Sequence, residues 1–273
     1  ILFADEQFFL PEHRVINEAL PAGTPITEYV IFDLETTSAE VEEAQIIELA
    51  ALRIEHGEAV DTYQFLVRDV VVPREIVHLT GIDSELLQRE GVPLQECLQG
   101  FLSWLGDRPL LAHNALRYDL PVLRRALETL GLSLGARTLL DSLLLAPLAF
   151  AHDPEPPEVY QLESLHALVS GGVHESAHRA LPDCHATLRV VTACLVRLQQ
   201  LPPPVQEALS LLPVPEFRLV WTREGVDEAA VKARWQGVLR QEAHRSQVHL
   251  ASGKAARTWQ DLLPHPRPGQ ERM

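Results

Sequence analysis

Three strand-like segments follow one another near the start of this chain, and this is the feature that most limits how it can fold. Runs of β-branched and aromatic residues predict strands at 28–33, 46–55 and 59–67, of which the last two are joined by a tight turn. Farther along, helical and strand patterns alternate, with short apolar strands at 109–113 and 137–142. This order predicts an α/β fold in which helices flank a mixed five-stranded sheet.

The spacing of apolar residues also predicts the helices that would flank this sheet. They are expected at 83–90, 93–105, 120–132, 143–150, 161–169 and 182–200. Asp83 is placed to cap the first of them, and Gly131 is placed to end the third.

Proline-rich segments divide the chain into three parts. An irregular N-terminal extension, residues 1–26, precedes the regular pattern, and five prolines within 201–217 predict a domain boundary after residue 200. We therefore expect a core domain over 27–200, followed by a connector and a small C-terminal α/β extension over 201–273. With 46% hydrophobic residues among 273, the chain can fill one such core.

The formal net charge of −15 limits the ways in which this chain could bind nucleic acid. Binding through clustered lysines is disfavoured, since the chain has only Lys232 and Lys254. Contact would have to be local, assisted by metal, or supported by another domain. Three scattered cysteines, together with no recognisable signal peptide and no apolar run long enough to span a bilayer, predict a cytoplasmic protein without a membrane partner.

Two carboxylates stand at the end of the first predicted strand. Asp33 and Glu35 are two residues apart, so their side chains point to the same face. Taken alone, they could be two solvated acids at an exposed edge. However, Asp119 follows another predicted strand, and His178 and Asp183 precede or begin a predicted helix, which places all of them at one edge of the sheet. Four acids gathered there would need cations, and hard divalent ions are the natural partners of carboxylate oxygens.

Three short motifs in these places carry a resemblance to a known family. FDLETT at 32–37, HNALRYD at 113–119 and HRALPD at 178–183 resemble, in order and separation, the three exonuclease motifs of the DnaQ-like (DEDDh) 3′–5′ exonucleases. The likeness covers residues 27–200 and implies a ribonuclease H-like fold. The chain departs from the family pattern at positions that are not ligands, namely Ser38, Tyr118 and Cys184.

The resemblance implies that the protein hydrolyses phosphodiesters with two Mg²⁺ or Mn²⁺ ions. Asp33 would bridge both ions, and Glu35, Asp119 and Asp183 would complete the coordination. His178 would be the general base, because an imidazole can accept a proton from water near neutral pH.

The resemblance also suggests four residues that would contact the substrate. Thr36 would lie near the terminal 3′ hydroxyl, and His78, in VHLTGI at 77–82, would touch the terminal nucleotide. For His78 the alternative is a turn before the helix that Asp83 caps. His113 and Asn114 are interpreted as nucleotide-contacting or supporting residues, and a polar helix cap is the alternative for both.

Three other polar residues near the motifs are expected to have supporting roles or none. His185 lies two residues beyond Asp183 on a predicted helix, so it should point away from the site. Asp141 ends a strand without a motif and is expected to be structural. Glu48, which alternates with apolar neighbours, is expected to support the site.

The last residues of the chain suggest a larger protein. HPRPGQERM at 265–273 resembles the opening of the helicase core in DinG-like helicases, some of which carry a DnaQ-like domain at the N-terminus, and this implies a C-terminal helicase partner. The expected function is metal-dependent 3′–5′ hydrolysis of single-stranded DNA to nucleoside 5′-monophosphates. RNA remains an alternative substrate, and a catalytically idle module that binds nucleic acid and regulates a helicase remains an alternative function.

Overall fold

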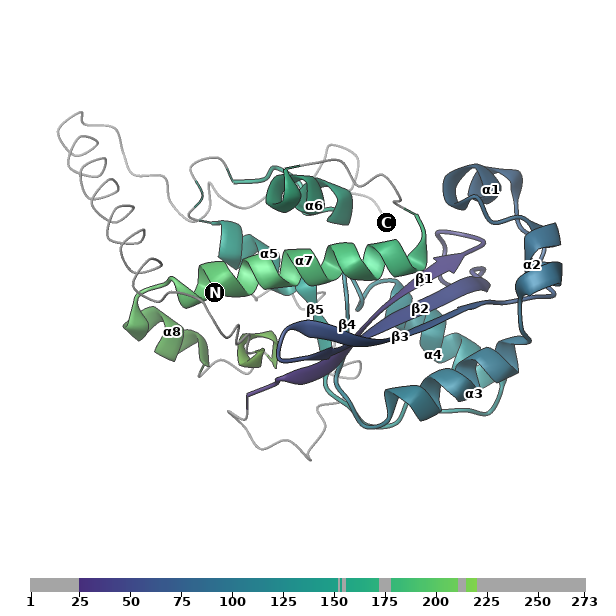
Figure 1. Cartoon of the computed structure of the whole chain (residues 1–273), viewed down its shortest axis with the longest axis horizontal. Helices are drawn as coiled ribbons and strands as arrows, with labels where there is room; N and C mark the ends of the chain where they lie inside the picture. The colour runs from purple at the N-terminus through teal and green to yellow at the C-terminus, as the bar shows by residue number, and fades with distance from the viewer. Residues whose placement is uncertain (1–24, 152, 154–155, 172–177, 211–214, 220–273) are drawn as a thin grey trace, which may run out of the picture. The chain divides into compact units, whose positions relative to one another are not determined.

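The computed structural model describes residues 25–151, 153, 156–171, 178–210 and 215–219. In this part of the chain the strands form one five-stranded sheet in the order β3-β2-β1-β4-β5 (Figure 1). β1 (Glu28–Thr36), β2 (Ile46–Glu55) and β3 (Glu58–Leu66) pair antiparallel. β4 (Leu110–Ala112) pairs parallel with β1, and β5 (Leu139–Asp141) pairs parallel with β4. The predicted mixed five-stranded sheet is confirmed.

β1 lies in the middle of the sheet and is buried on both faces. Tyr29 and Ile31 contribute to one cluster of buried residues, whereas Val30 and Phe32 contribute to another. This division follows from the two-residue period of a strand. Figure 1 shows the helices that contribute to the two clusters on opposite sides of the sheet. They are α5 (Ser142–Phe150), α6 (Leu162–Ser170) and α7 (Ala180–Gln199) on one side, and α3 (Leu94–Leu105) and α4 (Asp119–Thr129) on the other.

Two short helices between β3 and α3 differ in how well the sequence indicated them. In α2 (Ser84–Glu90), Asp83 caps the N-terminus by accepting a hydrogen bond of 2.7 Å from the Leu86 backbone, as predicted. α1 (Arg74–Thr80) was not predicted, because its seven residues are too few to show a helical period. It ends at Gly81, whose φ of +72° is favourable for glycine.

Part of the predicted connector packs with the core. The connector contains α8 (Pro203–Ser210) and a 3₁₀ turn over Pro215–Arg218. Ile26 forms a parallel bridge with Leu219, and the Ile26 backbone N–H donates to the Arg218 carbonyl at 2.6 Å. The first residues of the chain and those beyond 219 lie outside the described residues, so the three-part division, including the C-terminal α/β extension, stays a prediction. Of the described helices, none has the length and apolar character needed to cross a membrane.

Candidate active site

The end of β1 presents Asp33 and Glu35 on one face of the strand. Glu35 is only 9% exposed, which does not fit the alternative of two solvated acids at an open edge. Directly after Glu35 the pairing of β1 with β2 shifts register. Irregularities of this kind bend a strand and redirect its side chains, and they are frequent beside active sites.

Two helices bring further acids to this place. Asp183 lies in the first turn of α7, and its carboxylate oxygen is within 4.8 Å of those of Asp33 and Glu35. Asp119, the first residue of α4, is buried and is not part of this three-residue group. Its charge nevertheless acts on Asp33. β1, α4 and α7 thus gather the four acids that the sequence singled out.

Burial and the charges of neighbouring acids raise the pKa values of Asp33, Glu35 and Asp119 when no metal is bound. For Asp33, burial is the largest cause of a strongly raised pKa, and the charge of Asp119 is the next. Burial, followed by the charge of Asp183, raises the pKa of Glu35 to about 8. Burial raises the pKa of Asp119 to about 7, although backbone hydrogen bonds oppose the rise. An oxygen-only donor set whose members repel each other fits a hard divalent cation such as Mg²⁺ or Mn²⁺.

These raised pKa values predict how stability depends on pH without metal. The folded protein holds protons on Asp33, Glu35 and Asp119 that the unfolded chain, with carboxyl pKa values of about 4, has released. The free energy of unfolding in chelator should therefore fall as pH rises from about 4 to about 8. Saturating Mg²⁺ should reverse most of this fall.

Thermal unfolding in EDTA across this pH range would measure the effect against an Asp33→Asn/Glu35→Gln double variant. The variant should show a flatter pH dependence, because two of the titrating acids are gone. Parallel curves for the two proteins would contradict the prediction.

His178 lies two residues before the start of α7, in a constrained backbone conformation. Its φ of +66° lies in the left-handed region, which is uncommon for residues other than glycine. The His178 backbone N–H donates to Asp183 Oδ2 at 3.0 Å, so the predicted base and the predicted ligand are held together. His185 is exposed on α7 whereas Asp183 is buried, which agrees with the expectation that His185 points away.

Thr36 is buried and hydrogen-bonded, and Tyr118 is its main partner. The Thr36 hydroxyl donates to the Ser38 carbonyl at 3.0 Å, and the Tyr118 hydroxyl bonds to both Thr36 Oγ1 and the Ser38 carbonyl. Two of the positions where the chain departs from the family pattern therefore contact each other. Tyr118, the residue that precedes Asp119, thus ties the start of α4 to the loop after β1. Contact of Thr36 with a nucleotide stays a prediction.

The ring of His113 is fully engaged within the protein. Its Nδ1 lies 2.8 Å from the Ser142 hydroxyl, and its Nε2 lies 2.9 Å from the Tyr160 carbonyl. Burial lowers the pKa of His113. The neutral ring therefore donates from Nε2 to the carbonyl and accepts at Nδ1 from the hydroxyl. This arrangement favours a supporting role, and nucleotide contact by His113 stays a prediction.

Asp141 organises the loop that leads to Asp119. Its carboxylate accepts hydrogen bonds from the backbones of Asn114, at 2.9 Å, and Leu116, at 3.2 Å, and it caps α5 through Leu143 at 2.9 Å. These contacts agree with the structural role expected for Asp141. Asn114 has a φ of +60°, and its backbone is fixed by Asp141, whereas its side chain stays a candidate for nucleotide contact.

His78 lies in the last turn of α1 and is exposed. Residues 74–80 form a helix, and the turn expected before the helix that Asp83 caps begins at Gly81. Contact between His78 and a terminal nucleotide stays a prediction.

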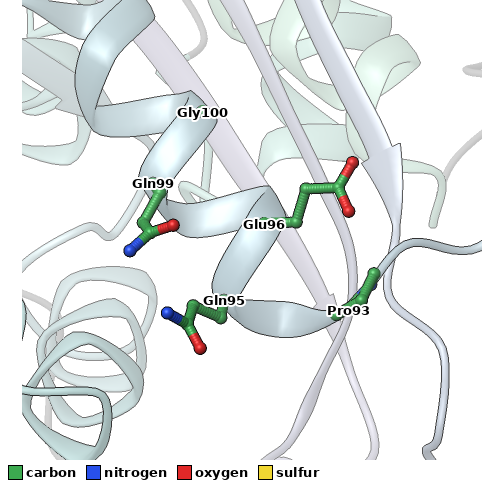
Figure 2. Close-up of a pocket in the computed structure, with 5 residues that line it drawn as sticks. All are labelled: Pro93, Gln95, Glu96, Gln99 and Gly100. Atoms are coloured by element: carbon green, nitrogen blue, oxygen red, sulfur yellow. The ribbon is translucent and has the colours of Figure 1, made fainter.

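Figure 2 shows the residues that line a surface hollow at α3. The side chains of Gln95 and Gln99 extend to one side of the helix there, and Glu96 extends to the other. The residues lining the hollow are Pro93, Gln95, Glu96, Gln99 and Gly100, which include none of the predicted site residues. The hollow therefore adds nothing to the acidic site.

Arg179 is a neighbour of the site that the sequence did not single out. It forms an ion pair with Glu48 at 3.0 Å, and the Glu48 side chain is fully buried. Glu48 itself could be noticed in the sequence, because it is a charged residue inside the apolar run of β2. Its partner could not be read from sequence, because the two residues are 131 positions apart.

Comparison with known proteins agrees with this geometry. A family model described as an exonuclease matches residues 30–191. The PolC-type DNA polymerase III of Listeria welshimeri is 30% identical over 186 residues, which cover 64% of this chain and 12% of that protein. The PolC-type polymerase of Halalkalibacterium halodurans is 34% identical over 141 residues, which cover 48% of this chain and 10% of that protein. The chain thus spans only a small part of these relatives.

Among solved structures, Escherichia coli exonuclease I in complex with a dA16 oligonucleotide is similar, with a TM-score of 0.57. The sequence identity is 20%, and the match covers 67% of this chain and 43% of that chain. At this identity the likeness concerns the fold, and it confirms the predicted ribonuclease H-like exonuclease fold.

Proposed function

The chain belongs to the exonuclease family whose model spans residues 30–191, and we propose that it removes nucleotides from the 3′ end of single-stranded DNA as nucleoside 5′-monophosphates. This proposal rests on one observation: at the end of β1, carboxylate oxygens of Asp33, Glu35 and Asp183 lie within 4.8 Å of one another. Such a group of acids is suited to holding metal at a phosphodiester, and it is poorly suited to binding a polyanion without metal.

The proposed roles are those that the resemblance to the family implies, and contacts of the described residues support them. Asp33, Glu35 and Asp183 would hold two divalent ions, with Asp119 completing the ligand set from the start of α4. When bound, such ions supply positive charge that stabilises the phosphate in the transition state. His178 would accept the proton of the attacking water on a ring nitrogen, since its backbone is fixed to Asp183. Thr36, at the end of β1, would contact the terminal nucleotide.

DNA is proposed as the substrate because the relatives are DNA polymerases and because exonuclease I was solved with a DNA oligonucleotide. The helicase partner expected from residues 265–273 has weaker support. That segment lies outside the described residues, and the two curated relatives named above are polymerases. Attachment to a helicase therefore stays a prediction.

Activity should need a divalent metal and a free 3′ end. Four acids without metal would repel the phosphate, so EDTA should stop degradation of 5′-labelled single-stranded DNA, and Mg²⁺ or Mn²⁺ should restore it. A 3′-phosphorothioate or 3′-blocked strand of the same sequence should resist degradation.

The same assay with RNA of matched sequence would identify the preferred substrate. Degradation that persists in EDTA, or from a blocked 3′ end, would contradict the proposed chemistry. An inactive protein that still binds single strands would favour a regulatory binding module instead.

A further inference from the structure

Glu48 is a fully buried carboxylate whose two oxygens accept four hydrogen bonds. Arg179 donates from Nε to Oε2 and from Nη2 to Oε1, both at 3.0 Å. The Ala180 backbone N–H donates to Oε2 at 3.2 Å, and Gln64 Nε2 donates to Oε1 at 2.8 Å. Because every oxygen is paired twice, the orientation of this carboxylate, and of the arginine fork on it, is strongly determined.

The pair joins the sheet to the start of α7. Arg179 is the residue before the helix, and its own side chain makes no capping bond to the helix backbone. Glu48, reaching across from β2, accepts the N–H of Ala180 instead. A carboxylate is favourable at a helix N-terminus, where backbone N–H groups lack partners and the dipole is positive. The position of the first turn of α7 therefore depends on a residue of the sheet.

The contact between Glu48 and Arg179 adjoins both groups of site residues, namely those on β1 and those at the start of α7. Glu48 is the register partner of Glu35 in the pairing of β1 with β2. On the other side, Arg179 directly follows His178, and Asp183 lies in the turn that begins at Ala180. The uncommon backbone conformation of His178, with a φ of +66°, persists only if its surroundings hold it. Because Arg179 is fixed to Glu48, the backbone of the adjacent His178 is restrained as well.

We propose that Glu48 and Arg179 are a positioning pair that sets the distance of His178 and Asp183 from Asp33 and Glu35. The proposal rests on the proposed nuclease function. Its effect would appear in turnover and in metal binding, because the pair holds the proton acceptor and one ligand. It would not appear in affinity for the nucleic acid.

Two other roles for Arg179 make different predictions. Its side chain is 38% exposed, so it could instead bind a phosphate of the substrate as a positive charge. A phosphate contact tolerates lysine, whereas the bidentate fork on Glu48 does not, because lysine has no planar pair of donors. A purely structural ion pair would change stability alone.

The test compares Arg179→Lys, Arg179→Gln and Glu48→Gln with the wild type, and Arg189→Gln serves as the matched control. Arg189 is exposed on the same helix. Steady-state kinetics would give kcat and KM for single-stranded DNA, and calorimetry with Mn²⁺ alone would give metal affinity. For each Arg179 and Glu48 variant we expect a loss of about 10–100-fold in kcat, with weaker metal binding. KM should stay near the wild-type value, and the control should behave as wild type.

Several outcomes would overturn the positioning role. They are an Arg179→Lys protein with wild-type kcat and metal affinity, variants in which KM rises while kcat is kept, and variants that lose only thermal stability. If Glu48→Gln fails to fold, Arg179→Lys carries the test, because its side chain is partly exposed. An inactive wild type would contradict the proposed function. The calorimetric titration with Mn²⁺ would then still show whether the pair positions the metal ligands.

Discussion

Asp33→Ala should abolish nucleotide release while leaving the fold intact. Asp33 is the acid on which the charges of Asp119, Asp183 and Glu35 all act, so its loss removes the centre of the proposed metal site. In EDTA the variant should be as stable as the wild type or more stable, because removing one of several repelling carboxylates relieves their repulsion. Gel assays with Mn²⁺ would measure release, and thermal midpoints in EDTA would measure stability.

Glu28→Ala is the matched control for this experiment. Glu28 is an exposed acid on the same strand and is not among the candidate ligands, so its loss should leave activity and stability unchanged. A large loss of stability in Asp33→Ala would show that Asp33 is structural. Residual activity close to wild type would exclude it as a bridging ligand.

His178→Ala should lower turnover by about 10²–10⁴-fold if His178 is the general base. Metal affinity and DNA affinity should barely change, because the four carboxylates remain. The pH–rate curve should lose its acidic limb. Raising the pH should restore part of the rate, because hydroxide then replaces the missing base. Asp119→Ala should not recover in this way, because it lacks a predicted ligand.

The backbone at His178 calls for a second variant. With a φ of +66°, this residue adopts a conformation that asparagine tolerates better than alanine. His178→Asn should therefore match His178→Ala in lost turnover while keeping the local backbone. Single-turnover rates from pH 5.5 to 9.5 at saturating Mn²⁺ would test all three variants. A wild-type rate and pH profile in His178→Asn would show that His178 is not the base.

Local patterns were enough to predict much of the sheet and the acids of the site. The bounds of β2, 46–55, agree with the prediction, because a strand buried on both faces leaves a long apolar run. Asp33 and Glu35 share a face because a strand has a period of two, and Asp183 lies in the first turn of α7 next to Pro182, a residue that favours a first turn. Because these features depend on residues that are close in sequence, they can be predicted from a single sequence.

Contacts between distant residues were decided only by the tertiary structure. The partner of Glu48 is 131 positions away, and both ring nitrogens of His113 are used by Ser142 and by the Tyr160 carbonyl. The pairing of Ile26 with Leu219 likewise places part of the predicted connector against the core. A periodic pattern records which face of an element is buried, but it does not record which residue from elsewhere covers that face. Local patterns in the sequence therefore predicted the fold class and the acids that the structure brings together at the end of β1, whereas only the packing of α7 against β2 placed Arg179 and Ala180 on Glu48.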